Sequence, residues 1–280
     1  VVLGVAQDAG FPQADCYKYC CRSIQNHPNK AQSVVSLGIV DADTDESWLI
    51  DATPDFPAQK HLLHDLSPQA QFSGIFLTHA HIGHYTGLMY LGREAMGASQ
   101  VPVYSLPRMA SFLTNNGPWD QLIKLKNINM RPLKVDSLIT LSNNFSIKPI
   151  QVPHRDEYSE TAGYQIIGPK KKILFIPDID KWEKWDRDIR LLIKEVDIAL
   201  LDGSFFQNGE LPNRDMSEIP HPFVEESMAY FSDLPSEEKA KIHFIHFNHT
   251  NPLLNPESEA TKRVEEAGFK VARQGLRWSL

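Results

Sequence analysis

Apolar residues recur along the chain with two different periods, and the period predicts where strands and helices lie. Short apolar or alternating runs rich in Val, Ile, Leu and Phe are typical of strands, whereas apolar residues three or four positions apart are typical of helices. The strand-like segments are residues 1–5, 33–40, 47–51, 74–77, 145–152, 162–167, 172–176, 197–201 and 243–247. The helix-like segments are residues 57–66, 85–96, 182–195, 222–231 and 256–267.

The order of these segments predicts an α/β fold. Strands and helices are interleaved over the whole sequence, and no repeat, low-complexity segment or linker divides it. We therefore expect one domain over residues 1–280, built as a four-layer αββα sandwich of two mixed sheets flanked by helices. With 280 residues, 42% of them hydrophobic, the chain is long enough to bury such a core.

Residues that can bind a metal stand at the ends of several predicted strands. They are Asp51, His79, His154, Asp178, Asp202 and His246. Side chains at the ends of different strands meet on one rim of a layered α/β fold, so we expect these residues to converge on one site.

Three histidines, His79, His81 and His84, fall within six residues. They follow a predicted buried strand and precede a predicted helix, so they occupy a short strand-to-helix loop. Imidazole is a good ligand for zinc and similar metals. His79 and His81 can point the same way from an extended segment, while His84 approaches from another side, which suits a centre with two metal ions. A chance surface cluster or a tag remnant is the disfavoured alternative, because a tag would be terminal.

The segment Thr-His-Ala-His-Ile-Gly-His at 78–84 resembles the His-x-His-x-Asp-His signature of the metallo-β-lactamase superfamily. Further motifs of that family appear in order along the chain, at Asp51, His154, Asp178 and His246. The resemblance implies a buried Asp51 that braces the histidine loop.

The same resemblance implies the metal ligands. One ion would be held by His79, His81 and His154. A second would be held by His84 and His246, with Asp178 between the two ions. Zinc is the expected metal, with manganese or iron as alternatives, and one or two ions would activate water for hydrolysis.

The chain departs from the family signature at Gly83, where the family has Asp. Glycine supplies neither a ligand nor a proton acceptor, so the second site is weak, empty or completed by another carboxylate. Asp8, in the early loop Gln-Asp-Ala-Gly, is one candidate substitute. A turn residue before Gly10 is the favoured interpretation of Asp8.

The three cysteines, Cys16, Cys20 and Cys21, are odd in number and confined to one early loop, which argues against a disulfide framework. Together with His249 they would form the closed tetrahedral donor set of a structural zinc. Neighbouring side chains diverge, so either only one of Cys20 and Cys21 binds or the loop bends sharply. Three free, buried thiols are the alternative without metal.

A narrower resemblance concerns the pyrroloquinoline-quinone (PQQ) biosynthesis B proteins. The segments Leu-Gly-Val-Ala at 3–6, Gly-Phe-Pro-Gln at 10–13 and His-Phe-Asn-His-Thr-Asn-Pro at 246–252 are similar to motifs of those proteins. The related cyclic-phosphate phosphodiesterases carry three cysteines and a histidine three residues after the last catalytic one. His249 has that spacing from His246, which implies a zinc at the Cys/His group.

These features favour a metal-dependent hydrolase that acts on an ester, with a phosphodiester as the preferred substrate class. Asp178 and His221 are the candidate catalytic residues. His221 follows Asp202 in a long loop, and a plain loop histidine between two prolines is an equal alternative. Two other hypotheses stay open: a PQQ-B-like enzyme of cofactor biosynthesis, and a catalytically impaired member of the fold with only a structural zinc.

The net charge and the hydropathy of the sequence limit the kinds of partner that the protein is expected to bind. The net charge is -7 and no Lys/Arg run exceeds three residues, so no nucleic-acid surface is expected. No apolar run approaches the length of a membrane span. We expect a small-molecule substrate, and a homodimer is compatible with the sequence. The first residue is Val1 rather than Met, which indicates a removed upstream segment; a cytoplasmic location is slightly favoured.

Overall fold

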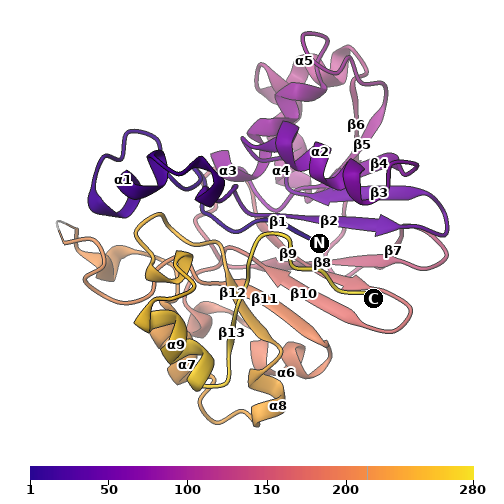
Figure 1. The fold of residues 1–280 in the computed structure, drawn as a ribbon. Helices are drawn as coiled ribbons and strands as arrows, with labels where there is room; N and C mark the ends of the chain where they lie inside the picture. The colour runs from indigo at the N-terminus through magenta and orange to yellow at the C-terminus, as the bar shows by residue number, and fades with distance from the viewer. Residues whose placement is uncertain (213) are drawn as a thin grey trace.

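The computed structural model describes residues 1–212 and 214–280, which form two β-sheets with helices outside them (Figure 1). The six-stranded sheet has the order β1-β2-β3-β4-β5-β6. Its strands are β1 (Val2–Gly4), β2 (Ser36–Asp41), β3 (Glu46–Ile50), β4 (Gln71–Phe76), β5 (Val101–Ser105) and β6 (Ile128–Pro132). The seven-stranded sheet has the order β13-β12-β11-β10-β9-β8-β7. Its strands are β7 (Ile139–Thr140), β8 (Ser146–Val152), β9 (Thr161–Ile167), β10 (Lys172–Ile176), β11 (Ile198–Asp202), β12 (Ile242–Ile245) and β13 (Lys270–Val271).

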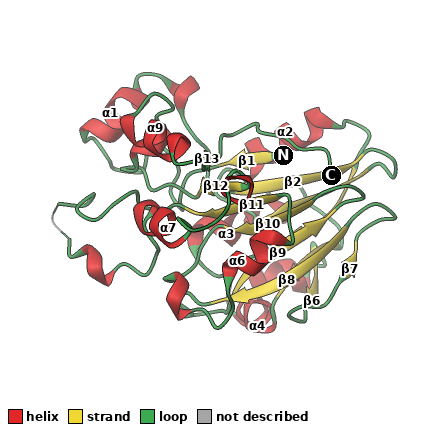
Figure 2. Cartoon of the chain, turned by 90° about the horizontal axis from the view of Figure 1, so that it is seen from below, coloured by secondary structure: helices red, strands yellow, loops and turns green. Residues whose placement is uncertain are grey.

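The helices form the two outer layers. Above the first sheet in Figure 1 lie α2 (Phe56–Leu66), α4 (Pro107–Asn115) and α5 (Trp119–Lys124). Below the second sheet lie α6 (Ile189–Lys194), α7 (Val224–Tyr230), α8 (Ser236–Lys239) and α9 (Glu259–Glu266). Figure 2 shows the second sheet from its helical side, with α6 and α7 in front of the strands. Both sheets contain parallel and antiparallel pairs, so the predicted αββα sandwich of mixed sheets is confirmed.

The alternation of side chains along β3 shows how the layers are filled. Trp48 and Ile50 point into the core that both sheets share, whereas Leu49 points to the other face. There Leu49 belongs to a second apolar cluster with Phe56 and Leu63 of α2. A half-buried strand would need only one apolar face, so the continuous apolar run is explained by burial on both sides. Each such side chain contributes about 1.5–3 kcal/mol of hydrophobic stabilisation.

Strand direction brings the polar strand ends together. β3 and β4 are parallel, and β10, β11 and β12 are parallel to one another. β8 runs the same way as β10, because each pairs antiparallel with β9 between them. The carboxyl ends of these strands therefore share one end of the sandwich, on the left in Figure 1, near α3 (Ile82–Tyr85) and α1 (Tyr19–Gln25).

Two predicted helices are wrong in detail. Instead of a helix over 85–96, the chain forms the short α3 and then a 3-10 helix, Thr86–Leu91. Gly87 N–H donates to Ala52 O, outside the helix, which interrupts the α-helical ladder. The helix expected over 182–195 is also divided, into the 3-10 turn Trp182–Lys184 and α6. Asp188 caps α6 by accepting from Arg190 N–H, so the helix starts there.

No helix within residues 1–212 and 214–280 is long and apolar enough to cross a membrane.

Candidate metal centre

The ends of β4, β8 and β10 bring together the first group of predicted ligands: His79, His81, His154 and Asp178. One donor atom from each lies within 4.8 Å of the others. His79 Nε2 is 2.8 Å from His81 Nδ1 and 3.2 Å from Asp178 Oδ2. His154 Nε2 lies 3.2 Å from the other oxygen of the same carboxylate. Three imidazoles and a carboxylate are a donor set that zinc prefers.

A second group lies on the other side of Asp178 and contains His84, His246 and Asp8. The Nε2 atoms of His84 and His246 are each 3.9 Å from Asp178 Oδ2. Asp178 therefore stands between the two groups, as the sequence pattern implies. The structure also brings in Asp8, which the sequence favoured only as a turn residue.

The third group consists of Asp178, Asp202 and His221. His221 is buried, with Nδ1 2.8 Å from Asp202 Oδ2 and 3.1 Å from Asp178 Oδ1. Of the two interpretations of His221, the structure favours the one that places it at the centre rather than in a remote loop.

A hydroxyl and a carboxylate orient the imidazoles on each sheet. The Thr78 hydroxyl lies 3.0 Å from both Asp51 oxygens and 3.0 Å from His79 Nδ1. His84 Nδ1 donates directly to Asp51, at 2.7 Å. These bonds occupy the Nδ1 atoms and direct the Nε2 atoms of both histidines toward Asp178.

The second sheet repeats this arrangement with Ser204. Its hydroxyl donates to Asp202 Oδ1 at 2.8 Å and lies 2.9 Å from His246 Nδ1. Asp202 thus reaches the predicted ligand His246 through Ser204. Both hydroxyls were missed as site residues, although Thr78 immediately precedes His79 and Ser204 follows Asp202 by two positions.

The buried nitrogens facing the centre fit a metal. His84 Nε2, His154 Nε2 and His246 Nε2 have no hydrogen-bond partner of suitable geometry among the described residues. A buried polar atom without a partner costs about 1–3 kcal/mol. Three such atoms directed at one carboxylate are explained if metal ions occupy the space between them.

Burial also sets the protonation of these histidines. It lowers the pKa of His154 to about 3 and, together with neighbouring imidazoles, holds the pKa values of His79 and His246 well below the usual range. These three are therefore neutral, which is the metal-binding form. For His84, burial opposes the charged form, but the Asp51 carboxylate outweighs it and raises the pKa to about 9. Metal binding to His84 must displace a proton.

The early loop brings Cys16, Cys20, Cys21 and His249 together, with one donor atom from each within 4.8 Å of the rest. The Sγ atoms of Cys16 and Cys20 are 3.6 Å apart. The chain turns into α1 at Tyr19, and this change of direction lets the adjacent pair reach one point. Both cysteines of the adjacent pair belong to the group, and they lie in the first turn of α1 instead of a sharply bent loop. Three thiols and an imidazole match a structural zinc.

A cavity of about 320 Å³ adjoins the histidine groups, and Asp8, His221 and His249 line it. Two guanidinium groups, those of Arg155 and Arg214, also belong to its wall. The space beside the centre can therefore accept an anionic group.

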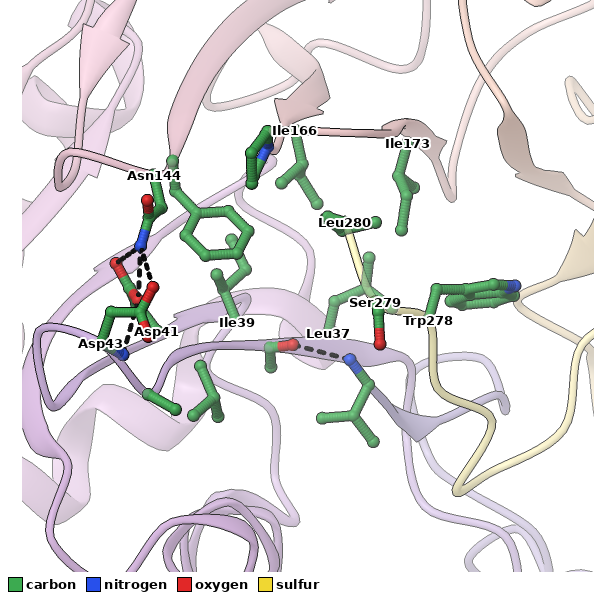
Figure 3. A pocket seen from close by; sticks show the side chains of 16 residues that line it. Leu37, Ile39, Asp41, Asp43, Asn144, Ile166, Ile173, Trp278, Ser279 and Leu280 are labelled. Carbon is green, nitrogen blue, oxygen red and sulfur yellow. Dashed lines mark hydrogen bonds between the residues drawn. The ribbon is translucent and has the colours of Figure 1, made fainter.

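A larger cavity, of about 420 Å³, lies beside the turn between β2 and β3, at the opposite end of β3 from Asp51 (Figure 3). Its polar groups are already paired with one another. Asn144 Nδ2 is 3.2 Å from Asp41 Oδ1 and 2.9 Å from Asp43 Oδ2, and the rest of the wall is mostly apolar. The chemistry therefore belongs to the smaller cavity.

Comparisons with known proteins show the family of the chain. The model of the beta-lactamase superfamily domain matches residues 47–244. A coenzyme PQQ synthesis protein B from Nitrosococcus oceani is 24% identical over 98% of this chain and 97% of its own length.

Solved structures share the fold. A zinc-bound PqqB from Methylobacterium extorquens superposes with a TM-score of 0.82 at 21% identity, covering 100% of this chain and 99% of its own. A diphosphatase of the PhnP family has a TM-score of 0.66 at 22% identity, covering 99% and 94%. The chain belongs to the beta-lactamase superfamily.

Proposed function

We propose that this chain is a metal-dependent hydrolase of a small anionic ester, with a phosphodiester as the preferred substrate class. The observation that carries the proposal is the convergence on Asp178 of buried imidazole nitrogens that have no partner among the described residues, beside a cavity lined by two arginines. The third hypothesis from sequence, a fold member with only the Cys/His zinc, leaves these nitrogens unexplained.

The residues divide into metal holders and substrate groups. Zinc fits the donors, and the superposable PqqB is a zinc-bound protein. When bound, the metal lowers the pKa of water so that it becomes nucleophilic at neutral pH. His79, His81 and His154 would hold one ion, and His84 and His246 a second, with Asp178 between them.

His221 is the group that would move a proton. Its Nδ1 is engaged by Asp202 and Asp178, which leaves Nε2 for the cavity that His221 lines. Hydrolysis breaks the ester P–O bond to the leaving oxygen and forms a P–O bond to water. Burial opposes the charged form of His221, but Asp202 and Asp178 outweigh it and raise its pKa to about 9, so its Nε2 carries a proton at neutral pH. Nε2 gives this proton to the leaving oxygen, while the proton that water loses goes to solvent and solvent reprotonates His221, which balances the reaction.

Arg155 and Arg214 would select the charge of the substrate. Guanidinium groups bind phosphate oxygens through paired N–H donors, so they suit an anionic ester better than a neutral one. Arg155 lies directly after the ligand His154, and its side chain is about half exposed. It can therefore reach a bound phosphate from the cavity wall.

Hydrolysis of a bis-aryl phosphate, measured together with bound metal, tests the proposal. We expect His79→Ala to lose metal and turnover, because His79 Nε2 lies at the first donor group. His64→Ala is the matched control, since His64 is an exposed histidine on α2. His221→Asn should retain metal and lose on the order of 10²–10⁴ in turnover. Wild-type protein that binds metal at the histidines but hydrolyses no bis-aryl phosphate with zinc, manganese or iron would contradict the proposal.

A role in PQQ synthesis is the second candidate. The similarity to PQQ synthesis protein B extends over 98% of this chain, which favours a shared pathway. Bound iron with oxygen consumption on a PQQ precursor would support this function. Phosphodiester turnover with zinc alone would exclude it.

A further inference from the structure

Gly83 stands where the superfamily signature has its aspartate, and the structure shows what fills that space. A Cβ atom at residue 83 would lie 2.5 Å from Asp8 Oδ1 and 2.6 Å from Asp8 Cα. The second contact is with the backbone and cannot be relieved by a side-chain rotation. An aspartate at 83 and the loop that carries Asp8 therefore exclude each other.

Asp8 brings a carboxylate to the same place from a different part of the chain. Its Oδ1 lies 3.8 Å from His84 Nε2, and the two form one potential metal-binding group with His246. The side chains of both histidines are fully buried, and their Nε2 atoms have no hydrogen-bond partner among the described residues. The carboxylate of Asp8 is 30% exposed and lines the cavity.

We propose that Asp8 is the carboxylate ligand of the second metal ion, in place of the aspartate that Gly83 replaces. The inference rests on the metal centre of the proposed function, but it concerns ion binding and not turnover. Gly83 is then required because its missing side chain admits the Asp8 loop. The second site consists of Asp8, His84 and His246, with Asp178 shared.

Backbone bonds fix the loop against the strand end that carries His246. Gln7 N–H donates to Phe247 O at 2.8 Å, and Phe247 N–H donates to Val5 O at 2.8 Å. Asp8 and His246 therefore lie on two segments that are paired immediately beside the site. This pairing fixes the backbone beside Asp8 independently of the histidine loop.

A purely structural role for Asp8 is the competing explanation. Asp8 Oδ1 accepts from Gly83 N–H at 3.2 Å, near the start of α3. Asn keeps a side-chain oxygen for this bond but loses the negative charge. Asp8→Asn therefore separates a ligand from a turn residue, whereas Asp8→Ala removes both functions.

The test is a titration of the metal-free full chain with cobalt(II), whose absorption distinguishes thiolate sites from imidazole and carboxylate sites. We expect wild-type protein to bind one ion with thiolate bands and two without. Asp8→Asn should bind one of the two ions outside the thiolate site at least about tenfold more weakly, and its thiolate site should bind cobalt as in wild type. Asp15→Asn, an exposed residue of the same loop, is the matched control and should titrate like wild type.

Two results would overturn the inference. One is an Asp8→Asn titration indistinguishable from wild type. The other is wild-type protein that takes up only one ion outside the thiolate site. Neither result bears on hydrolysis, which the His79→Ala experiment tests separately. A Gly83→Ala variant gives a second check that leaves Asp8 intact: its added Cβ should displace the loop and weaken the same ion.

Discussion

The hydroxyl groups of Thr78 and Ser204, which no sequence pattern marks, determine how the histidines face the metal centre. Thr78 with Asp51, and Ser204 with Asp202, form equivalent pairs at the ends of the two sheets. Each pair occupies Nδ1 of a histidine, which selects the tautomer that leaves Nε2 free for a metal. Asp51 and His246 also have left-handed backbone conformations, with φ of 68° and 69°. Such strain is typical of functional sites and requires a well-packed surrounding.

Ser204→Ala tests whether the hydroxyl of Ser204 orients the His246 imidazole. The variant removes the partner of His246 Nδ1, so His246 should bind its ion about 10–100-fold more weakly. The change removes one oxygen atom and adds none, so the fold should persist. Zinc affinity against a competing chelator, with circular dichroism as the check on folding, measures the effect. Ser217→Ala, at an exposed serine, should match wild type; equal affinities in both variants would refute the orienting role.

At the residue scale, the resemblance to the superfamily implied the histidines and Asp178 as ligands, because its motifs appear in order along the chain. Thr78 and Ser204 carry no comparable signal, since hydroxyl residues are common in any loop. For Asp8 the sequence offers a second carboxylate ligand and favours a turn residue, because an aspartate shortly before a glycine is typical of a turn. Only the packing of its loop against Gly83 distinguishes the two roles.

At the scale of elements, hydrogen bonds from β9 tie the two sheets together beside the histidine loop, and one of them runs from Ala162 N–H to Thr78 O. The buried hydroxyl of Tyr164, on β9, donates to Leu77 O, immediately after β4. Thr78 follows directly and bonds to Asp51. The position of the histidine loop therefore depends on contact between the two sheets and not on β4 alone.

Tyr164→Phe should lower the free energy of unfolding by about 1–3 kcal/mol, because Leu77 O is left without this partner in a buried place. Urea denaturation measures the change. Tyr104→Phe is a suitable comparison. The Tyr104 ring stacks on Phe76 and is partly buried, so this variant measures the effect of losing a tyrosine hydroxyl alone. A Tyr164 variant no less stable than the Tyr104 variant would show that the Tyr164 bond between the sheets is unimportant.

The elements that escaped prediction are α1, β7, α8, β13 and those between residues 101 and 132. β5 contains Pro102, which cannot donate to the ladder, and β6 ends in Pro132. α5 has only six residues and follows Gly117 and Pro118. Proline is typical of a break in strands and helices, so the sequence gives no sign of these elements. Their contacts in the structure show that the strands belong to the first sheet and the helices to the layer that contains α2.

At the scale of the whole molecule, the Cys/His group connects distant parts of the chain. Cys16 lies in the loop after β1, Cys20 and Cys21 lie in the first turn of α1, and His249 lies after β12. A zinc at this group would bind the loop to the second sheet beside the histidine centre. The order of the strand-like and helix-like segments predicted the layered fold, and the polar residues at strand ends predicted that one site forms where those ends meet. Neither pattern could predict that this loop enters the metal centre.

Cys21→Ser should bind one zinc fewer per chain and expose the loop to protease. Trypsin should cleave after Lys18 and Arg22, both exposed, faster than in wild-type protein, because loss of the ion frees the segment that contains them. His27→Ala, at an exposed histidine outside the group, serves as the comparison. Unchanged zinc content and unchanged cleavage in the cysteine variant would argue against a zinc at this group.

The pairing of Gln7 with Phe247 also has a consequence for synthesis. A ribosome adds about 5–20 residues per second, so Asp8 and the three cysteines emerge roughly ten seconds or more before His246 and His249 are made. Neither the second histidine group nor the Cys/His group has its full set of donors during that interval. Metal insertion at both must therefore wait until the ribosome has passed residue 249, and the thiols of the nascent chain are accessible to oxidants until then.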